Sequence, residues 1–112
     1  MLNQVVLVGR LVRDLEVRTS DGDKKYSFIT LAIPRSYKNH DGIYETDFIE
    51  CILWNNIASN TAEYCKKGDI IGIKGRVESR SIEENNVNKN ILQIIAEKVT
   101  FLSSKKQDNE ET

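Results

Sequence analysis

Five β-prone segments and a single helical one follow one another along this chain, and their order constrains the fold more than any other sequence feature. The first segment, residues 4–11 (QVVLVGRL), is a nearly continuous apolar run. It predicts a strand buried on both faces, in which Gly9 permits the close approach of another strand. The second segment, residues 26–34 (YSFITLAIP), alternates between two faces, and we expect the strand to end at Pro34.

A polar hairpin over residues 35–45, with His40-Asp41-Gly42 at its tip, leads into the third β-prone segment, residues 46–54 (TDFIECILW). The helical segment comes next. Asn55 and Asn56 are candidate N-caps, Lys66-Lys67-Gly68 ends the helix, and apolar or small side chains recur at helical spacing at Ile57, Thr61, Tyr64 and Cys65. The sequence therefore predicts one short amphipathic helix after the third strand.

Residues 70–80 alternate cleanly and predict a fourth strand, residues 81–90 form a polar, asparagine-rich hairpin tip, and residues 91–102 predict a fifth strand. Five strands with a helix between the third and fourth is the plan of the all-β OB-fold, a partly open five-stranded barrel. We expect residues 1–102 to form this single domain. Residues 103–112 hold no apolar side chain and predict a flexible polar tail.

Length and composition exclude several classes of protein. A chain of 112 residues is long enough for one core and too short for a core plus a separate catalytic lobe. It has no apolar run long enough to cross a membrane and no export signal, so we expect a cytoplasmic protein. Cys51 and Cys65 lie in apolar contexts and are expected to be buried, reduced thiols, while the only histidine, His40, lies in a turn. We predict no metal site and no cofactor.

Aromatic side chains supply the clearest functional signal. Strand alternation places Phe48, Glu50, Ile52 and Trp54 on one face of the third strand and a sufficient apolar set on the other. Tyr37 lies in the charged segment Arg35-Ser36-Tyr37-Lys38, where a core aromatic is unexpected. Two alternatives stay open: that Phe48 and Trp54 are core residues, and that Tyr37 packs a loop onto the barrel.

Basic side chains are interleaved with these rings, although the chain as a whole has a formal net charge of −1. Stacking of bases on aromatic rings contributes about 1–3 kcal/mol per base, and cations nearby track the phosphates. This combination suits sequence-independent binding of a single strand. An ordinary solvated strand face is the alternative for the basic residues of the fourth strand, where Glu78 weakens the patch. The predicted cations are Arg10, Arg35, Lys38, Lys74, Arg76 and Arg80.

Five blocks of the sequence together resemble bacterial single-stranded DNA-binding proteins, in order and at the family's spacings. They are NQVVLVGRL from residue 3, DLEVR from residue 14, DFIECILW from residue 47, AEYCKKG from residue 62 and GRVESR from residue 75. The resemblance covers residues 1 to about 102. It implies an OB-fold protomer, a homotetramer, and single-stranded DNA wrapped over aromatic and basic surfaces in replication, recombination, repair or DNA uptake.

Carried over by position, the family's stacking aromatics fall at Tyr37, Phe48 and Trp54, whereas a fourth falls at Ile82, so one stacking platform is missing. Residues 103–112 hold neither the flexible linker nor the acidic tip of longer family members. We therefore expect a short form that coats DNA without recruiting replication or repair proteins through such a tip.

Other functions compete with DNA coating. A replication-restart protein of the same fold would use its barrel chiefly to dock proteins, and an RNA-binding barrel would stack bases equally well. A nuclease would need carboxylates converging around a metal ion. Asp14, Asp47 and Glu50 do not share one face, so we predict that the protein is not an enzyme.

Overall fold

The computed structural model describes residues 1–104, so most of the predicted tail, residues 105–112, lies outside the described residues. The described chain forms six strands and one helix in the order β1 (Val5–Leu11), β2 (Arg18–Thr19), β3 (Lys25–Lys38), β4 (Tyr44–Trp54), α1 (Asn55–Tyr64), β5 (Ile70–Glu84) and β6 (Val87–Ser103). Apart from the two-residue β2, this is the predicted order.

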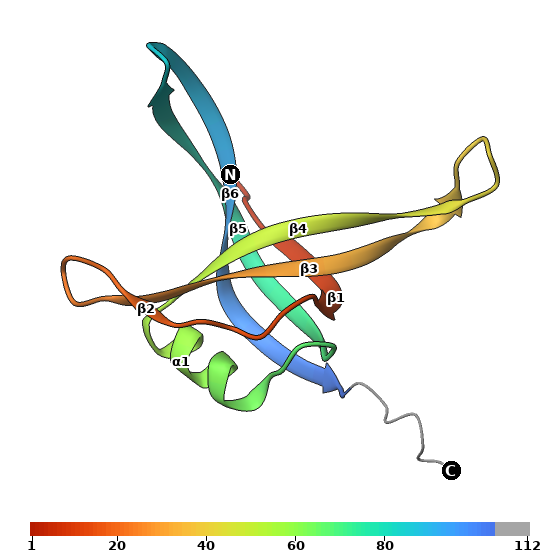
Figure 1. Cartoon of the computed structure of the whole chain (residues 1–112), viewed down its shortest axis with the longest axis horizontal. Helices are drawn as coiled ribbons and strands as arrows, with labels where there is room; N and C mark the ends of the chain where they lie inside the picture. The colour runs from red at the N-terminus through yellow and green to blue at the C-terminus, as the bar shows by residue number, and fades with distance from the viewer. Residues whose placement is uncertain (105–112) are drawn as a thin grey trace.

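The strands form one sheet that closes into a barrel (Figure 1). Their order is β1-β5-β6-β4-β3-β2, and β1 also pairs with β3. Two short seams make the closure: β1 meets β3 at Arg10–Ala32 and Leu11–Leu31, and β4 meets β6 in parallel at Cys51–Ile94 and Ile52–Ile95. A closed five-stranded barrel with its helix between β4 and β5 confirms the predicted OB-fold.

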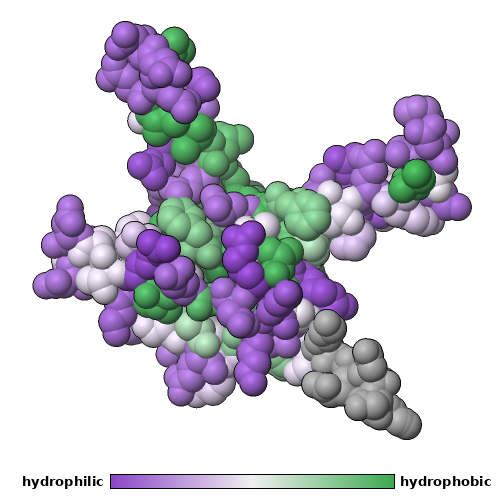
Figure 2. Space-filling model, in the orientation of Figure 1, coloured by the Kyte–Doolittle hydropathy of each residue, from purple (hydrophilic) through white to green (hydrophobic). Residues whose placement is uncertain are grey.

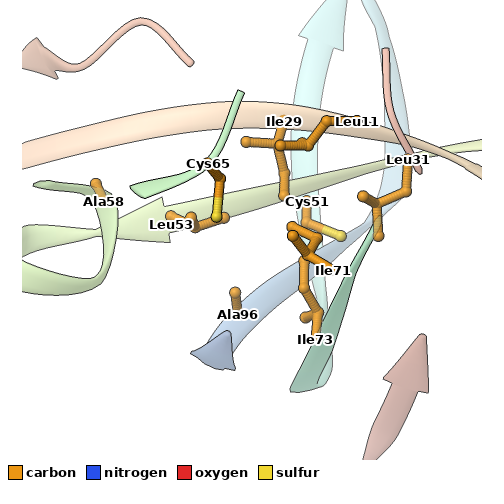
Figure 3. Packing of buried hydrophobic residues seen from close by; sticks show 10 residues of the cluster. All are labelled: Leu11, Ile29, Leu31, Cys51, Leu53, Ala58, Cys65, Ile71, Ile73 and Ala96. Carbon is orange, nitrogen blue, oxygen red and sulfur yellow. The ribbon is translucent and has the colours of Figure 1, made fainter. Parts of the chain in front are cut away.

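The core lies inside this barrel and under α1 (Figure 3). Leu31 and Leu53, from β3 and β4, are completely buried. Cys51 and Cys65 are buried, unpaired thiols, as predicted. Burial raises the pKa of the Cys51 thiol to about 11, which keeps it protonated near neutral pH. The other core side chains are Leu11, Ile29, Ala58, Ile71, Ile73 and Ala96.

Two glycines allow strands to pass closely. A Cβ on Gly9 would lie 2.7 Å from Cγ1 of Ile33 and 3.0 Å from the carbonyl oxygen of Ala32, which confirms the expected close approach. A Cβ on Gly75 would overlap the carbonyl oxygen of Ile95, at a register shift between β5 and β6. A larger residue at Gly9 would displace the Ile33 side chain, and one at Gly75 would require the β6 backbone to move.

The prediction that the first strand is buried on both faces is wrong for the single chain. Leu7 and Leu11 point toward the core, but Val6 and Val8 are 68% and 51% exposed on the outer face. The strand alternates as an ordinary barrel strand does, and its apolar outer residues have no covering element among residues 1–104.

Two hairpins extend beyond the barrel as arms, one formed by β3 and β4 and the other by β5 and β6 (Figure 1). The predicted end of a strand at Pro34 is wrong, because β3 continues to Lys38 with an irregular register between these residues. Past Ala32, β3 has only β4 as a neighbour, and proline is tolerated at such an edge.

The polar tip predicted over residues 81–90 is also much shorter than expected. The strands β5 and β6 continue to Glu84 and Val87, and only Asn85 and Asn86 form the turn. Both asparagines adopt positive φ angles, 53° and 65°, which asparagine tolerates better than most residues.

The helix departs from its prediction at both ends. Trp54, not an asparagine, occupies the N-cap position and makes no side-chain capping bond, while Asn55 is the first helical residue. Tyr64 is exposed because the next residue, Cys65, takes the buried position at the C-cap. The turn after the helix is where the sequence predicts it, with the Lys67 amide donating to Asp14. In the described part of the chain, no helix is long and apolar enough to span a bilayer.

Candidate nucleic-acid interface

Aromatic side chains line the outer face of β3 and β4. The strand register places Tyr26 opposite Trp54, Phe28 opposite Ile52, and Ala32 opposite Phe48. Residues in such pairs project to the same side of the sheet. The residues of both strands that belong to the core cluster project to the other side, whereas Ile52 is buried on the aromatic side. We call Tyr26, Phe28, Phe48 and Trp54 the aromatic strip. Phe48 is 67% exposed, so it lies outside the core.

The rings at one end of the aromatic strip are in contact. The Tyr26 and Trp54 ring centroids are 5.5 Å apart with an interplanar angle of 43°, and Tyr26 meets Phe28 edge-on at 5.9 Å. Trp54 is half-buried against Tyr26, which restricts its orientation while leaving part of the indole accessible. Such a ring is preorganised to receive a flat partner.

Tyr26 and Phe28 are site residues that the sequence pattern did not single out. Strand alternation places Phe28 on the face opposite Ile29, Leu31 and Ile33. The register with β4 cannot be read from this alternation. It puts Phe28 beside Ile52, two residues along β3 from the Tyr26–Trp54 pair.

Tyr37 lies apart from the aromatic strip, on the β3–β4 arm, and is 62% exposed. Near it, the Lys38 Nζ atom lies 5.5 Å from the ring centroid of Tyr44, a cation–π contact that also holds the lysine on the arm. Tyr44 is itself exposed and forms a pair with Lys38 across the two strands. The arm therefore carries two exposed rings and, beside them, the cation of Lys38.

Arg10 and Arg76 lie at the ends of two cross-strand rows that begin in the aromatic strip. One row runs from Phe48 through Ala32 to Arg10. The other runs from Phe28 through Ile52 and Ile95 to Arg76. The barrel thus brings cations from β1 and β5 to either side of the rings. The Arg10 guanidinium donates a 2.7 Å hydrogen bond to the Gly68 carbonyl oxygen, which fixes its position.

Two of the predicted cations are engaged by carboxylates. Arg35 meets Asp47 at 2.8 Å and Glu45 at 3.1 Å, and Arg76 meets Glu78 at 2.7 Å and Glu97 at 3.0 Å. The hydrogen bond and charge of Arg35 lower the pKa of the Asp47 carboxyl. Bonds to their carboxylates raise the pKa of both guanidinium groups, Arg35 and Arg76.

Lys74 and Arg80 lie away from the aromatic strip. Lys74 pairs with Val6 on one side and Lys98 on the other. It lines a shallow apolar depression of about 370 Å³ on the outer face of β1, β5 and β6, together with Val6, Val8, Gly72, Ile73, Lys98, Thr100 and Leu102. Arg80 is exposed on the β5–β6 arm opposite Ile91. Lys74 and Arg80 therefore lie in different directions from the aromatic strip.

A groove of about 350 Å³ separates β4 from the base of the β5–β6 arm. Figure 2 shows apolar side chains along the lower part of this arm and over the centre of the barrel, with mostly hydrophilic tips. Ile82, where the resemblance places a fourth ring, lies farther out on the arm, opposite Lys89. The groove lining comprises Phe28, Phe48, Ile49, Glu50, Cys51, Val77, Ile91, Leu92, Gln93 and Ile94.

The carboxylates considered for a nuclease do not converge. Asp14 accepts a hydrogen bond from the Lys67 amide, and Asp47 pairs with Arg35 at another part of the barrel. Among residues 1–104, no three side chains of the metal-ligating types gather into a cluster.

The known proteins that this sequence resembles belong to one family. Residues 2–102 match the model of the single-strand binding protein family. Single-stranded DNA-binding protein B of Bacillus subtilis (strain 168) is 41% identical over 109 residues, which is 96% of either chain. Single-stranded DNA-binding protein 3 of Listeria innocua is 43% identical over 94% of this chain and 66% of its own length. Single-stranded DNA-binding protein 1 of Lactococcus lactis is 39% identical over all of this chain and 75% of its own.

Proposed function

Because this chain belongs to the single-strand binding protein family, a family of non-catalytic proteins that bind single-stranded DNA, we propose that it holds the strand by stacking bases on Phe48, Trp54 and Tyr37. Tyr26 and Phe28 complete the surface, Tyr26 by supporting the indole and Phe28 by extending the apolar contact. Residues 1–102 act as the binding domain.

The exposure of Phe48 carries this proposal. A phenyl ring that is 67% exposed loses contact with water when a base covers it, whereas a core ring gains nothing from a ligand. The core of this barrel is filled from the opposite face by Leu31, Leu53 and their neighbours. The ring is thus available to a ligand with a flat apolar face, which every nucleobase has.

Cations around the rings hold the phosphates in this proposal. Arg10 and Arg76 flank the aromatic strip, Arg35 and Lys38 lie toward the β3–β4 arm, and Lys74 and Arg80 extend the surface over β5. A net charge of −1 for the whole chain makes the general attraction of DNA weak. The positions of these side chains around the rings therefore determine how well they bind the phosphates.

We also propose that the chain assembles as a homotetramer through β1. Beyond Arg10 and Leu11, the edge of β1 that faces β3 has no partner strand within residues 1–104, so residues 5–8 of two copies can pair across a twofold axis. The exposed Val6, Val8 and Leu102 form a second apolar surface on the adjoining face. The edge of β1 and the apolar surface beside it supply the two different interfaces that a dihedral tetramer needs.

The cellular role follows from coating DNA. A protein that covers bases without reading their edges protects any exposed strand, so replication, recombination, repair and DNA uptake in the cytoplasm are the processes in which we place it.

Trp54 provides the test, because it is the only tryptophan. Its emission should fall when oligo-dT is added, and should change little with a duplex of the same length. A parallel titration with oligo-U measures the preference for DNA over RNA. Binding of duplex as tightly as oligo-dT, or binding of oligo-dT without any change in emission, would contradict stacking on this ring.

A further inference from the structure

Carboxylates occupy the bidentate Nε/Nη2 fork of both Arg35 and Arg76 in the free chain. Every guanidinium nitrogen of Arg76 contacts a carboxylate: Nε and Nη2 meet Glu78 at 2.9 and 2.7 Å, and Nη1 meets Glu97 at 3.0 Å. Arg35 is held in the same way, with Nε and Nη2 donating to Asp47 and Nη1 to Glu45. Neither arginine has a nitrogen free of a carboxylate contact.

Each of these two clusters has one positive and two negative charges. A cluster with a net charge of −1 repels a phosphate, and a phosphate cannot occupy the Nε/Nη2 fork unless the carboxylate held there leaves it. The same arginines lie beside the aromatic rings, Arg76 at the end of the row from Phe28 and Arg35 two residues from Tyr37.

The ion pairs are exposed enough to exchange. Their side chains are between 36% and 47% accessible, and ion pairs at this level of exposure contribute little stability. A phosphate has the same charge and the same bidentate geometry toward arginine as a carboxylate. It can therefore take the place of a carboxylate at modest cost.

We infer that Glu78, Glu97, Asp47 and Glu45 act as internal competitors of the DNA phosphates for Arg76 and Arg35, and that this competition sets the affinity and salt dependence of binding. The inference rests on the proposed DNA surface. Binding at these positions is an exchange of anions on an arginine that remains paired in both states.

A distinct salt dependence follows from this exchange. For single strands, the logarithm of the binding constant falls with the logarithm of salt concentration with a slope of about −0.7 per phosphate contact, because each contact releases condensed cations. A carboxylate expelled from Arg76 takes up a cation from solution and offsets part of that release. The wild-type slope should thus be shallower than its number of phosphate contacts implies.

A rigid structural role is the competing explanation, since Arg76 bridges β5 and β6 while Arg35 bridges β3 and β4. The two explanations predict opposite effects on affinity. Removal of a structural brace lowers stability and leaves affinity unchanged or weaker. Removal of a competitor raises affinity and steepens the salt slope.

The decisive variant is Glu78→Gln with Glu97→Gln, titrated with oligo-dT across a series of salt concentrations. The matched control is Glu63→Gln with Glu83→Gln, which changes the net charge equally at carboxylates that make no ion pair within residues 1–104. At low salt, the first variant should bind more tightly than the control by up to about fivefold per released ion pair. Its salt slope should be steeper by up to about 0.7.

Arg76→Met provides the second arm. In that background, Glu78→Gln with Glu97→Gln should have no advantage over the charge-matched control, because the contested guanidinium is gone. Asp47→Asn with Glu45→Gln repeats the experiment on Arg35. It keeps the inference testable if the first variant fails to fold. Thermal melting shows whether each variant is folded.

Equal affinities and slopes for the variant and its control, or a gain that persists in Arg76→Met, would overturn the inference. In either case wild-type binding of oligo-dT would leave the proposed function intact. If the wild type does not bind oligo-dT, the proposed function itself fails.

Discussion

Replacing Phe48 with alanine should weaken DNA binding and should cost the fold much less than truncation of a buried ring. Truncating a fully buried phenylalanine costs about 3–5 kcal/mol. Because two thirds of Phe48 is exposed, we expect the free energy of unfolding to fall by only about a third of that, about 1–1.7 kcal/mol. Loss of one stacked base costs about 1–3 kcal/mol of binding per occupied site. This corresponds to an affinity reduced about 5- to 150-fold.

Two measurements separate the effects. Titration of Trp54 emission with oligo-dT gives the affinity, and thermal melting followed by circular dichroism gives the stability. Leu53→Ala is the matched control, because Leu53 lies on the same strand but is completely buried on the opposite face. It should lose about 2–5 kcal/mol of stability, while its folded molecules bind normally. Phe48→Tyr should keep most of the affinity, since a ring of similar size still stacks.

Phe48→Ala protein that binds oligo-dT as tightly as the wild type would show that Phe48 stacks no base. A variant that lost affinity only in proportion to its unfolded fraction would show that Phe48 supports the fold and not the ligand.

Three further outcomes follow from the structure. Val8→Glu places a charge on the exposed β1 face and should give a smaller assembly than the wild type in light scattering; a tetrameric mass for this variant would contradict assembly through that face. Gly75→Ala should lower the urea midpoint by an amount equivalent to about 1–3 kcal/mol or more, because the added methyl overlaps the Ile95 carbonyl oxygen, and an unchanged midpoint would show that the strands can separate freely. Folding raises the pKa of Cys51 from 9.0 to about 11, so above pH 9 the thiol ionises in the unfolded chain before it does in the folded one. The free energy of unfolding should then fall between pH 9 and 11, and it should fall less in Cys51→Ala.

The order of elements could be predicted from the sequence because each strand and the helix has its own local periodicity. Alternation in residues 26–34 and 46–54 identifies two faces without any knowledge of partners. The ends of the strands could not be found in this way. The β5–β6 arm continues to Asn85-Asn86 through a polar stretch, because cross-strand pairing favours an extended backbone where side chains give no apolar pattern.

The candidate site was predictable to the same extent. Periodicity places Phe48 and Trp54 on one face, but whether that face is outside the barrel depends on which side closes, and the structure places it outside. The contact between Tyr26 and Trp54 requires the register of two strands. The pair of Arg76 with Glu97 joins residues on different strands, so no local pattern reveals that this cation is occupied.

Closure of the β4–β6 seam is the step of folding that we expect to be slow. The β3–β4 and β5–β6 hairpins join neighbouring parts of the chain, and hairpins form in about 1–10 μs. The β4–β6 seam joins Ile52 to Ile95 and so closes a loop that contains the helix and all of β5. The chain must lose the conformational entropy of this long loop before the barrel core gains its contacts. We expect Ile52→Val to slow refolding in stopped-flow experiments, and Val87→Ala at the far end of β6 to leave the refolding rate unchanged. If Ile52→Val accelerates only unfolding, the seam closes after the rate-limiting barrier, and the hairpins assemble into a barrel that is still open at its transition state.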